Sequence, residues 1–422
     1  MRSLIGLALL APLCSCWSGG NRNGGSGSGG TGPRKPPVGM VTTCSDTEAP
    51  LPALDDLPTV DALPDPFLSL DGTRITRADQ WACRRTEIAA QAAAYELGDN
   101  PGKPASVTGS FDAAAGKINV TASDGTKTAS FAATVTLPTT GTAPYPAMIG
   151  IGGIAIDPAG LNAMGVATIV FPNDTVAVQV DSGSRGKGAF YDLYGADHPA
   201  GAMMAWAWGV SRLIDVIEQT PAAQIDATRL GVTGCSRNGK GALIAGAFEP
   251  RIALTIPQES GSGGSASWRV SDAQYASGTV VQTLFEITGE NVWFRKSFST
   301  FNYAAKQLPF DHHMIEGLVA PRALLIIENS SQVWLGNLST YNDSVAAHAI
   351  WQALGMPDRM GVSQIGDHAH CMWNGSQQAE VTAYVQKFLI GGGTASTNVI
   401  KTDGGYTFDQ ATWAPWTVPT LN

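Results

Sequence analysis

Hydrophobic and polar residues alternate along residues 117–123 and 128–137, on either side of Asp124-Gly125. This alternation is typical of strands with one buried face, and an Asp-Gly pair favours a tight type I′ hairpin turn. Residues 147–151 and 167–171 are instead short, continuous hydrophobic runs, as strands buried on both faces require. The pattern therefore predicts an antiparallel hairpin followed by central strands of a sheet.

Further along the chain, strand-like runs alternate with segments of helical spacing. Within residues 201–218, Met204, Trp208, Leu213 and Val216 recur at intervals that place them on one face of a helix. Strands that alternate with helices indicate a mostly parallel sheet with helices on both faces, so we predict one α/β domain. The other predicted strands are 229–233, 252–256, 323–327 and 361–365, and the other predicted helices are 237–248, 339–354 and 377–389.

The N-terminus has the pattern of an export signal. Arg2 precedes a hydrophobic run over residues 4–13, which is too short to span a bilayer as a helix. We predict a signal peptide at residues 1–16, which ends in a sequence that loosely resembles a bacterial lipobox. Lipidation of Cys16 would anchor the mature chain at the cell surface, whereas plain secretion would release it. Both localisations stay open at this point.

A segment rich in glycine, serine and proline follows. Nine of the 22 residues in 18–39 are Gly, three are Ser and three are Pro. Such a segment buries too little apolar surface to offset its ordering entropy, so we expect a flexible tether. We place this linker at residues 17–43 and a single folded domain at residues 44–422.

Charge and cysteine content narrow the possible functions. The chain carries 26 basic and 35 acidic residues, for a net charge of −9, which argues against binding to nucleic acid. Four cysteines lie beyond the signal peptide, enough for two disulfides in an oxidising compartment. Their spacing does not choose among three possible connectivities. These cysteines are Cys44, Cys83, Cys235 and Cys371.

One motif points to nucleophilic chemistry: Gly234-Cys235-Ser236-Arg237-Asn238-Gly239 lies between a predicted strand and a predicted helix. A serine on such a tight turn presents its hydroxyl above the sheet edge, where amides at the helix start can stabilise an oxyanion. The second glycine comes one residue later than in the G-x-S-x-G motif. We predict that Ser236 is a nucleophile, and the alternative is a helix N-cap.

A nucleophilic serine needs a histidine base and an acid that orients the base. His368 and His370 follow the last predicted strand, where an α/β-hydrolase has its histidine. This pair could instead be structural or half of a metal site, but no metal-ligand spacing occurs elsewhere, so we expect no metal. Glu259 and Glu328 each follow or end a predicted strand, and spacing leaves the choice of acid open.

Eight short runs carry a resemblance to a known family. They are residues 63–67, 83–85, 149–153, 205–210, 232–242, 256–261, 334–336 and 368–371. Through them the sequence resembles the glucuronoyl esterases, carbohydrate esterase family 15, from about Cys44 to Leu389. The resemblance implies an α/β-hydrolase three-layer sandwich. It also implies a serine esterase that hydrolyses esters between (4-O-methyl-)glucuronic acid of xylan and lignin alcohols, through a glucuronoyl-enzyme intermediate and without a cofactor.

Carried over residue by residue, the resemblance implies that Ser236 is the nucleophile, Glu259 the acid and His370 the base. It places the oxyanion hole at Arg237. Residues that would contact the sugar are Lys240, Gln282, Glu290 and Trp334. It also implies the disulfides Cys44–Cys83 and Cys235–Cys371, of which the second would tie the serine turn to the histidine loop. We expect a monomer.

Two other functions stay open. The first is another carbohydrate or acetyl esterase, or another serine hydrolase, on the same fold. Much higher activity on small acetyl esters than on methyl glucuronate would favour it. The second is a non-catalytic carbohydrate-binding protein, which tight oligosaccharide binding without detectable hydrolysis would favour.

Overall fold

The computed structural model describes residues 51–421, which belong to one compact unit. The signal peptide, the linker and Cys44 lie outside the described residues. Lipidation of Cys16 and the Cys44–Cys83 disulfide therefore stay predictions. Within residues 51–421, the helices are too short or too polar to cross a bilayer.

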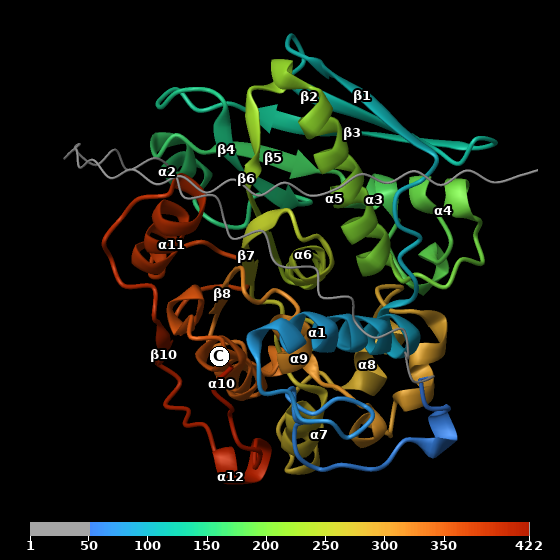
Figure 1. Ribbon diagram of the computed structural model, residues 1–422, viewed down its shortest axis with the longest axis vertical. Coiled ribbons are helices and arrows are strands. Elements are labelled where there is room, and N and C mark those ends of the chain that lie inside the picture. The colour runs from blue at the N-terminus through green and yellow to red at the C-terminus, as the bar shows by residue number, and fades with distance from the viewer. Residues whose placement is uncertain (1–50, 422) are drawn as a thin grey trace, which may run out of the picture. The chain divides into compact units, whose positions relative to one another are not determined.

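A ten-stranded mixed sheet forms the centre of the fold, in the order β1-β2-β3-β5-β4-β6-β7-β8-β9-β10 (Figure 1). The strands from β5 to β10 in this order pair in parallel, whereas β1, β2 and β3 form an antiparallel edge. The predicted mostly parallel sheet is confirmed. The strands are β1 (Ser106–Asp112), β2 (Lys117–Ser123), β3 (Thr128–Thr136), β4 (Tyr145–Ile151), β5 (Ala167–Phe171), β6 (Ile225–Cys235), β7 (Ile252–Gln258), β8 (Ala323–Glu328), β9 (Met360–Gln364) and β10 (Ile400–Thr402).

The predicted hairpin is present as β2 and β3, but its turn differs from the prediction. Ser123 pairs with Thr128, so the connection has four residues rather than the two of a type I′ turn. The Asp124 carboxylate accepts hydrogen bonds from the amides of Thr126 and Lys127, each at 2.7 Å. This side-chain capping stabilises the longer loop, because an aspartate can satisfy backbone donors two and three residues ahead.

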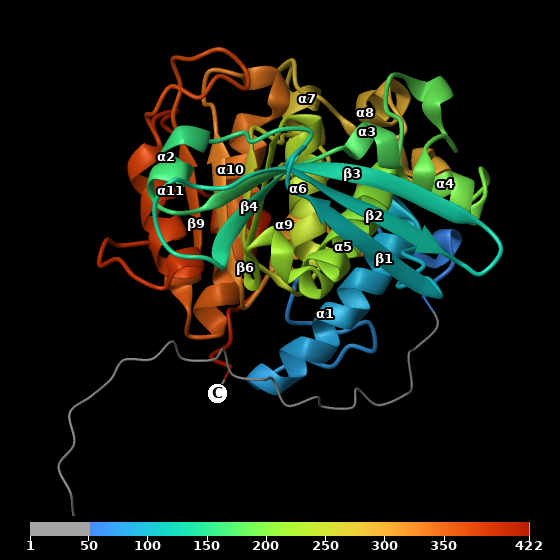
Figure 2. The same cartoon turned by 90° about the horizontal axis from the view of Figure 1, so that it is seen from above.

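Helices cover both faces of the sheet and enclose two hydrophobic cores. On β8, Leu324 and Ile326 point into a larger core that includes residues of the helices at 78–92, 202–219, 237–248, 312–317 and 337–353. Ala323, Leu325 and Ile327 point into a smaller core that includes residues of the helices at 158–163 and 378–385. This alternation is what a strand buried on both faces requires, and it produces three layers (Figure 2).

The helices largely follow the predicted segments. The helix predicted at 237–248 has those bounds, and the one predicted at 377–389 continues as a π-helical turn, η9 (Gln386–Ile390). The helices are α1 (Ala78–Ala92), α2 (Pro158–Ala163), α3 (Asn173–Val176), α4 (Ala189–Tyr194), α5 (Ala202–Gln219), α6 (Arg237–Phe248), α7 (Trp268–Ala276), α8 (Leu284–Glu290), α9 (His312–Gly317), α10 (Asn337–Ala353), α11 (Gln378–Val385) and α12 (Gln410–Trp413).

The carboxyl ends of four neighbouring strands gather the polar residues of interest. Ser236 follows β6, Glu259 follows β7, and Glu328 is the last residue of β8. His370 lies in the loop that follows β9. Because β6, β7, β8 and β9 are parallel neighbours, these ends meet at one edge of the sheet, where open α/β sheets bind their ligands.

Candidate active site

Ser236 occupies a strained turn between β6 and α6. Its backbone has φ 58° and ψ −127°, a conformation that costs a non-glycine residue about 1–3 kcal/mol. Two glycines make the turn possible. A Cβ at Gly234 would lie 2.3 Å from the carbonyl oxygen of Asn238, and a Cβ at Gly239 would lie 2.6 Å from that of Gln258. The turn therefore has the geometry of a nucleophile elbow.

The hydroxyl of Ser236 is not used for capping. Ser236 stands at the N-cap position of α6, yet its side chain accepts no capping hydrogen bond. The alternative, in which the serine side chain caps the helix, is therefore wrong. Among residues 51–421, the hydroxyl of Ser236 forms no hydrogen bond, and His370 is no exception. Catalytic hydrogen bonds often tighten only when substrate binds, so this geometry is compatible with a nucleophile.

His370 and Glu259 form the closest polar pair at the sheet edge. The Nδ1 atom of His370 lies 2.8 Å from Oε2 of Glu259. The Glu259 carboxylate is buried and also accepts hydrogen bonds from the Cys371 amide at 3.1 Å and the Gln258 side chain at 3.1 Å. These donors fix the carboxylate, which in turn fixes the imidazole ring. A hydrogen bond at Nδ1 leaves Nε2 of His370 as the nitrogen that can exchange a proton.

Backbone strain is concentrated at this site. Within residues 51–421, five non-glycine residues have a positive φ, and Ser236 (58°), Glu259 (44°) and Cys371 (62°) are three of them. Such conformations persist only where the surrounding structure determines them, and they cluster at functional sites. The backbone conformation therefore supports a functional role for this edge of the sheet, independently of the sequence motifs.

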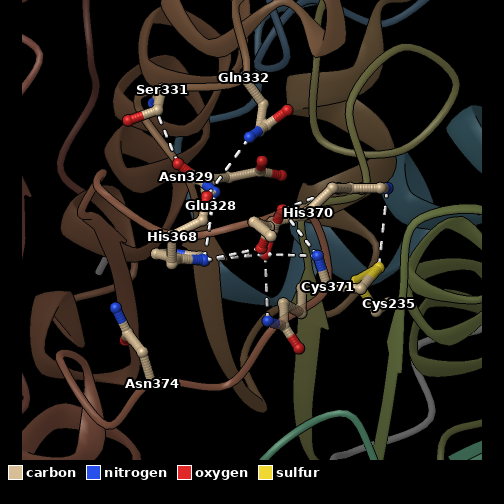
Figure 3. Close-up of polar contacts among 12 residues, drawn as sticks. Cys235, Glu328, Asn329, Ser331, Gln332, His368, His370, Cys371 and Asn374 are labelled. Atoms are coloured by element: carbon tan, nitrogen blue, oxygen red, sulfur yellow. Dashed lines mark hydrogen bonds and ion pairs between the residues drawn. A yellow bond between two sulfur atoms is a disulfide. The ribbon is translucent and has the colours of Figure 1, made fainter.

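His368 has a different role from that of His370. Its Nε2 lies 3.1 Å from the carbonyl oxygen of Ile365, and Asn329 contacts its Nδ1 at 3.1 Å (Figure 3). Its Nδ1 is also 3.8 Å from Glu259, a full ångström farther than that of His370. Both ring nitrogens of this buried side chain thus face partners within the protein, so His368 is a structural residue of the histidine loop.

A disulfide joins the serine turn to the histidine loop. Cys235 and Cys371 are bonded, with their Cα atoms 5.8 Å apart, as the resemblance implied (Figure 3). Cys235 directly precedes Ser236, and Cys371 directly follows His370, so the bond limits relative movement of Ser236 and His370.

The two disulfide sulfurs and the His370 ring lie close enough together to suggest a metal site. Disulfide sulfurs do not offer the thiolates that such a site needs, so the group does not fit a metal.

Glu328, the competing candidate for the acid, forms neither a hydrogen bond nor an ion pair with a histidine within residues 51–421. Its Oε1 accepts a hydrogen bond from the amide of Ser260 at 2.9 Å. Burial, together with the nearby charge of Glu259, raises the pKa of Glu328 to about 8. The geometry therefore pairs Glu259 with His370, and it leaves Glu328 as a buried, neutral carboxylic acid behind the site at neutral pH.

Glu328 should make the protein less stable as the pH rises. Its pKa is about 8 in the folded state against 4.5 for an ordinary glutamate, so only the unfolded chain releases the proton between these values. Stability falls with pH wherever the folded state binds more protons, here by on the order of a few kcal/mol. Glu328→Gln removes this titration and keeps an oxygen for Ser260. We expect the melting temperature of the variant, relative to that of the wild type, to increase as the pH rises from about 5 to about 8. A difference that does not vary with pH would contradict this assignment.

Lys240 is a buried cation next to the serine turn. It is 2% exposed, and its Nζ donates a hydrogen bond to the carbonyl oxygen of Ser260. Burial lowers the pKa of Lys240 to about 8, although the nearby charge of Glu290 opposes the shift. Lys240 is therefore not an exposed surface lysine.

Trp293 is a component of the site that the sequence did not reveal. The Lys240 ammonium lies 5.7 Å from its ring centre, and the Arg237 guanidinium lies 5.6 Å from it. Both cations are thus positioned by one aromatic ring, at a distance typical of cation–π contacts. The indole nitrogen donates to Gln179 at 2.7 Å, which holds the ring in place. Its place three residues after Glu290 is the one signal that could have found it.

The remaining predicted sugar contacts form one group beside His370. The Gln282 side chain donates to Glu290 at 3.1 Å, and the Gln282 amide donates to the carbonyl oxygen of Trp334 at 2.9 Å. The Trp334 ring is 39% exposed, and its centre is 5.3 Å from that of the His370 ring. Segments far apart in the sequence therefore present polar groups and an exposed indole next to the Glu259–His370 pair.

Comparisons with known proteins identify relatives of this chain. The family model described as "Glucuronyl esterase, fungi" matches residues 120–355. The 4-O-methyl-glucuronoyl methylesterase of Hypocrea jecorina is 50% identical over 85% of this chain and 76% of its own length. The protein of the same name from Podospora anserina is 46% identical over 92% of this chain and 79% of its own length.

Solved structures of such enzymes have the same fold. The glucuronoyl esterase catalytic domain from Hypocrea jecorina superposes with a TM-score of 0.83 at 49% identity, over 87% of this chain and 98% of its own. A mutant glucuronoyl esterase from Sporotrichum thermophile, in complex with methyl 4-O-methyl-β-D-glucopyranuronate, has a TM-score of 0.82 at 46% identity, over 87% of this chain and 97% of its own. The chain therefore has the α/β-hydrolase fold and belongs to the glucuronoyl esterase family.

Proposed function

We propose that this protein is a serine esterase that hydrolyses esters of glucuronic acid and 4-O-methyl-glucuronic acid. The natural ester bonds would be those between glucuronate side groups of xylan and lignin alcohols. The observation that carries the proposal is the 2.8 Å contact between His370 and Glu259, next to a strained serine turn. The family of the chain supports the same substrate class.

In the first half of the reaction, the glucuronoyl group is transferred from the ester to Ser236. The hydroxyl oxygen of Ser236 attacks the ester carbonyl carbon while Nε2 of His370 accepts the hydroxyl proton. The carbonyl oxygen becomes an oxyanion, to which the backbone N–H of Arg237 at the start of α6 can donate, a contribution of about 3 kcal/mol. Glu259 holds the imidazole ring and stabilises its positive charge. The breaking C–O bond releases the alcohol, which takes the proton from His370.

The second half of the reaction repeats these roles with water. His370 accepts a proton from a water molecule, whose oxygen attacks the glucuronoyl-Ser236 ester. The bond to Ser236 breaks, and His370 returns the proton to the serine oxygen. Glucuronic acid leaves, and the site is restored without a cofactor.

Selection of the sugar is explained by the group of residues beside His370, which consists of Gln282, Glu290 and Trp334. An esterified glucuronate has no carboxylate charge, so the site must recognise its hydroxyls through directed hydrogen bonds. The carboxylate of Glu290 and the amide of Gln282 offer both acceptors and donors. The exposed ring of Trp334 can lie against the apolar face of a pyranose.

Removing the charge of Lys240 should weaken activity on sugar esters selectively. Lys240→Met keeps the buried chain and removes the ammonium, whose hydrogen bonds are worth about 1.5–3 kcal/mol each. We expect kcat/KM for benzyl glucuronate to fall about ten- to a hundredfold. Hydrolysis of a small acetyl ester, which has no sugar to hold, should barely change. Equal losses on both esters would show that Lys240 supports the loop that carries Glu259, through its contact with Ser260, and would overturn its role in sugar recognition.

We also propose that the mature protein acts outside the cytoplasm as a monomer, either secreted or anchored by a lipid on Cys16. The hydrophobic run after Arg2 and the following linker support export. Expression of the full chain and of Cys16→Ser separates the two forms. An anchored protein moves from the membrane fraction to the medium in the variant, whereas a secreted one is in the medium in both cases. Light scattering of the purified protein measures its oligomeric state.

The proposed function is tested by comparing three esters on the purified enzyme. We expect benzyl glucuronate to be hydrolysed much faster than benzyl galacturonate and than a small acetyl ester. The galacturonate differs only in the orientation of one hydroxyl, so it tests recognition of the sugar. A preference for the acetyl ester would instead support a general acetyl esterase. Tight oligosaccharide binding with no hydrolysis would support a non-catalytic binding protein.

A further inference from the structure

A polar cavity is lined by sequence neighbours of the active-site residues Glu290 and Trp293. Its volume is about 190 Å³. The segment that begins at Glu290 gives Glu290 and Trp293 to the active site, and gives Asn291, Phe294 and Arg295 to this cavity. The opposite wall comes from the loop between α3 and α4, which Figures 1 and 2 both show beside the chain after α8.

The cavity is lined by three cations. Arg185 comes from the α3–α4 loop, whereas Arg295 and Lys296 lie at the start of η5 (Lys296–Phe301). Within residues 51–421, none of these three groups forms an ion pair with a carboxylate. Neutral polar residues complete the wall, among them Ser182, Thr288 and Ser299.

The two arginines are held in place by backbone carbonyls. The Arg185 guanidinium donates to the carbonyl oxygen of Phe294 at 3.0 Å. That of Arg295 donates to the carbonyl oxygens of Ala93 and Ala94, while its Nε is buried without a partner. Burial lowers the pKa of Arg185, because its lost hydration is not compensated by a carboxylate. Unpaired cations gathered in this way repel one another unless an anion binds between them.

A pair of exposed aromatic rings borders the same region. The rings of Phe285 and Tyr303 stack with centres 5.1 Å apart and are 48% and 83% exposed. The hydroxyl of Thr288, which lines the cavity, donates to Asn302, the neighbour of Tyr303, at 2.7 Å. Flat exposed aromatic rings suit the apolar faces of sugar rings. The bordering surface therefore favours an anion that is carried on a saccharide.

We propose that the cavity lined by Arg185, Arg295 and Lys296 binds the free carboxylate of a second acidic sugar on the polysaccharide whose ester is cleaved. The inference rests on the proposed function, because the same chain must reach the active site through its esterified sugar. Local cations are needed for this recognition, since the protein carries a net charge of −9 and does not attract polyanions in general. The carboxylate takes the place of the missing ion-pair partner, and hydrogen bonds from arginine orient it.

The test compares two substrates on charge variants. The first substrate is benzyl glucuronate, and the second is a xylo-oligosaccharide with one esterified and one free glucuronate. Lys296→Glu should lower kcat/KM for the oligosaccharide about tenfold and leave that for benzyl glucuronate unchanged. Arg185→Gln should act in the same direction. Lys117→Glu, an exposed charge reversal on β2, is the matched control and should change neither value.

A binding measurement separates this inference from the proposed function. Ser236→Ala should bind an oligosaccharide with two free glucuronates more tightly than xylotetraose, and Lys296→Glu in that background should remove the difference. An unchanged ratio of the two kcat/KM values in both variants overturns the inference while the esterase activity stands. Inorganic phosphate that competes as well as the acidic oligosaccharide would show a general anion site and also overturns it. Absence of benzyl glucuronate hydrolysis by the wild type would overturn the proposed function instead.

Discussion

Ser236→Ala should lower kcat/KM for benzyl glucuronate by about 10³-fold or more, because acyl transfer loses its attacking oxygen. The fold should be unaffected. The hydroxyl of Ser236 has no hydrogen-bond partner among residues 51–421, so its removal leaves no donor or acceptor unpaired. Alanine also meets the same backbone demand as serine at φ 58°. Initial rates and melting temperatures of the two purified proteins provide the measurement.

The residual rate of Ser236→Ala measures the contribution of the groups that remain. The Arg237 amide and the sugar contacts stay in place, so some acceleration over water should remain. Ser110→Ala, at an exposed position on β1, is the matched control and should keep the wild-type rate. Near-normal turnover by folded Ser236→Ala would show that the chemistry does not use this serine.

Glu259→Gln should reduce the rate far more than Glu328→Gln. Glu259 contacts Nδ1 of His370 at 2.8 Å, and a glutamine there neither stabilises the imidazolium nor favours the required tautomer. We expect a loss of about 10³-fold or more for Glu259→Gln. Glu328 is already neutral near pH 7 because burial raises its pKa to about 8, so its amide should be tolerated within a few-fold.

The two variants are measured under one set of conditions, since both replace a buried carboxyl by an amide of the same shape. A larger loss for Glu328→Gln would move the acid to the end of β8. Losses of similar size would mean that the two carboxyls share the role. Melting temperatures distinguish a catalytic loss from partial unfolding.

Much of the fold could be predicted because its central strands are buried on both faces. Residues 147–151 and 323–327 are continuous hydrophobic runs, and both are strands of the sheet. By contrast, β1 (Ser106–Asp112) was missed, because only Val107 of its seven residues is buried and no alternation marks it. The short β10 (Ile400–Thr402) was missed for a similar reason, since none of its residues is buried.

The catalytic geometry was predictable only in part. The position of Ser236 after a strand and before a helix could be read from local pattern, because the turn needs its flanking glycines. The choice of Glu259 over Glu328 could not, since both follow buried strands and only the long-range contact with His370 separates them. The resemblance to a known family supplied that choice before the geometry did.

Burial at the site was the hardest property to predict. Lys240 is one helical turn beyond Ser236, which placed it near the site but gave no sign that it is 2% exposed. Trp293, which comes from a distant segment, contacts both Lys240 and Arg237 with its ring. Such contacts arise from tertiary packing, and no local pattern in the sequence encodes them.

The central claim is that a glucuronoyl group is transferred to Ser236. Wild-type enzyme mixed with excess benzyl glucuronate and quenched in acid within a turnover should contain the acyl-enzyme intermediate. Peptide mass mapping should then find the mass of one glucuronoyl group on the peptide that carries Ser236, and no such adduct in Ser236→Ala. A glucuronoyl adduct on a different residue, in a protein that still hydrolyses the ester, would contradict the account.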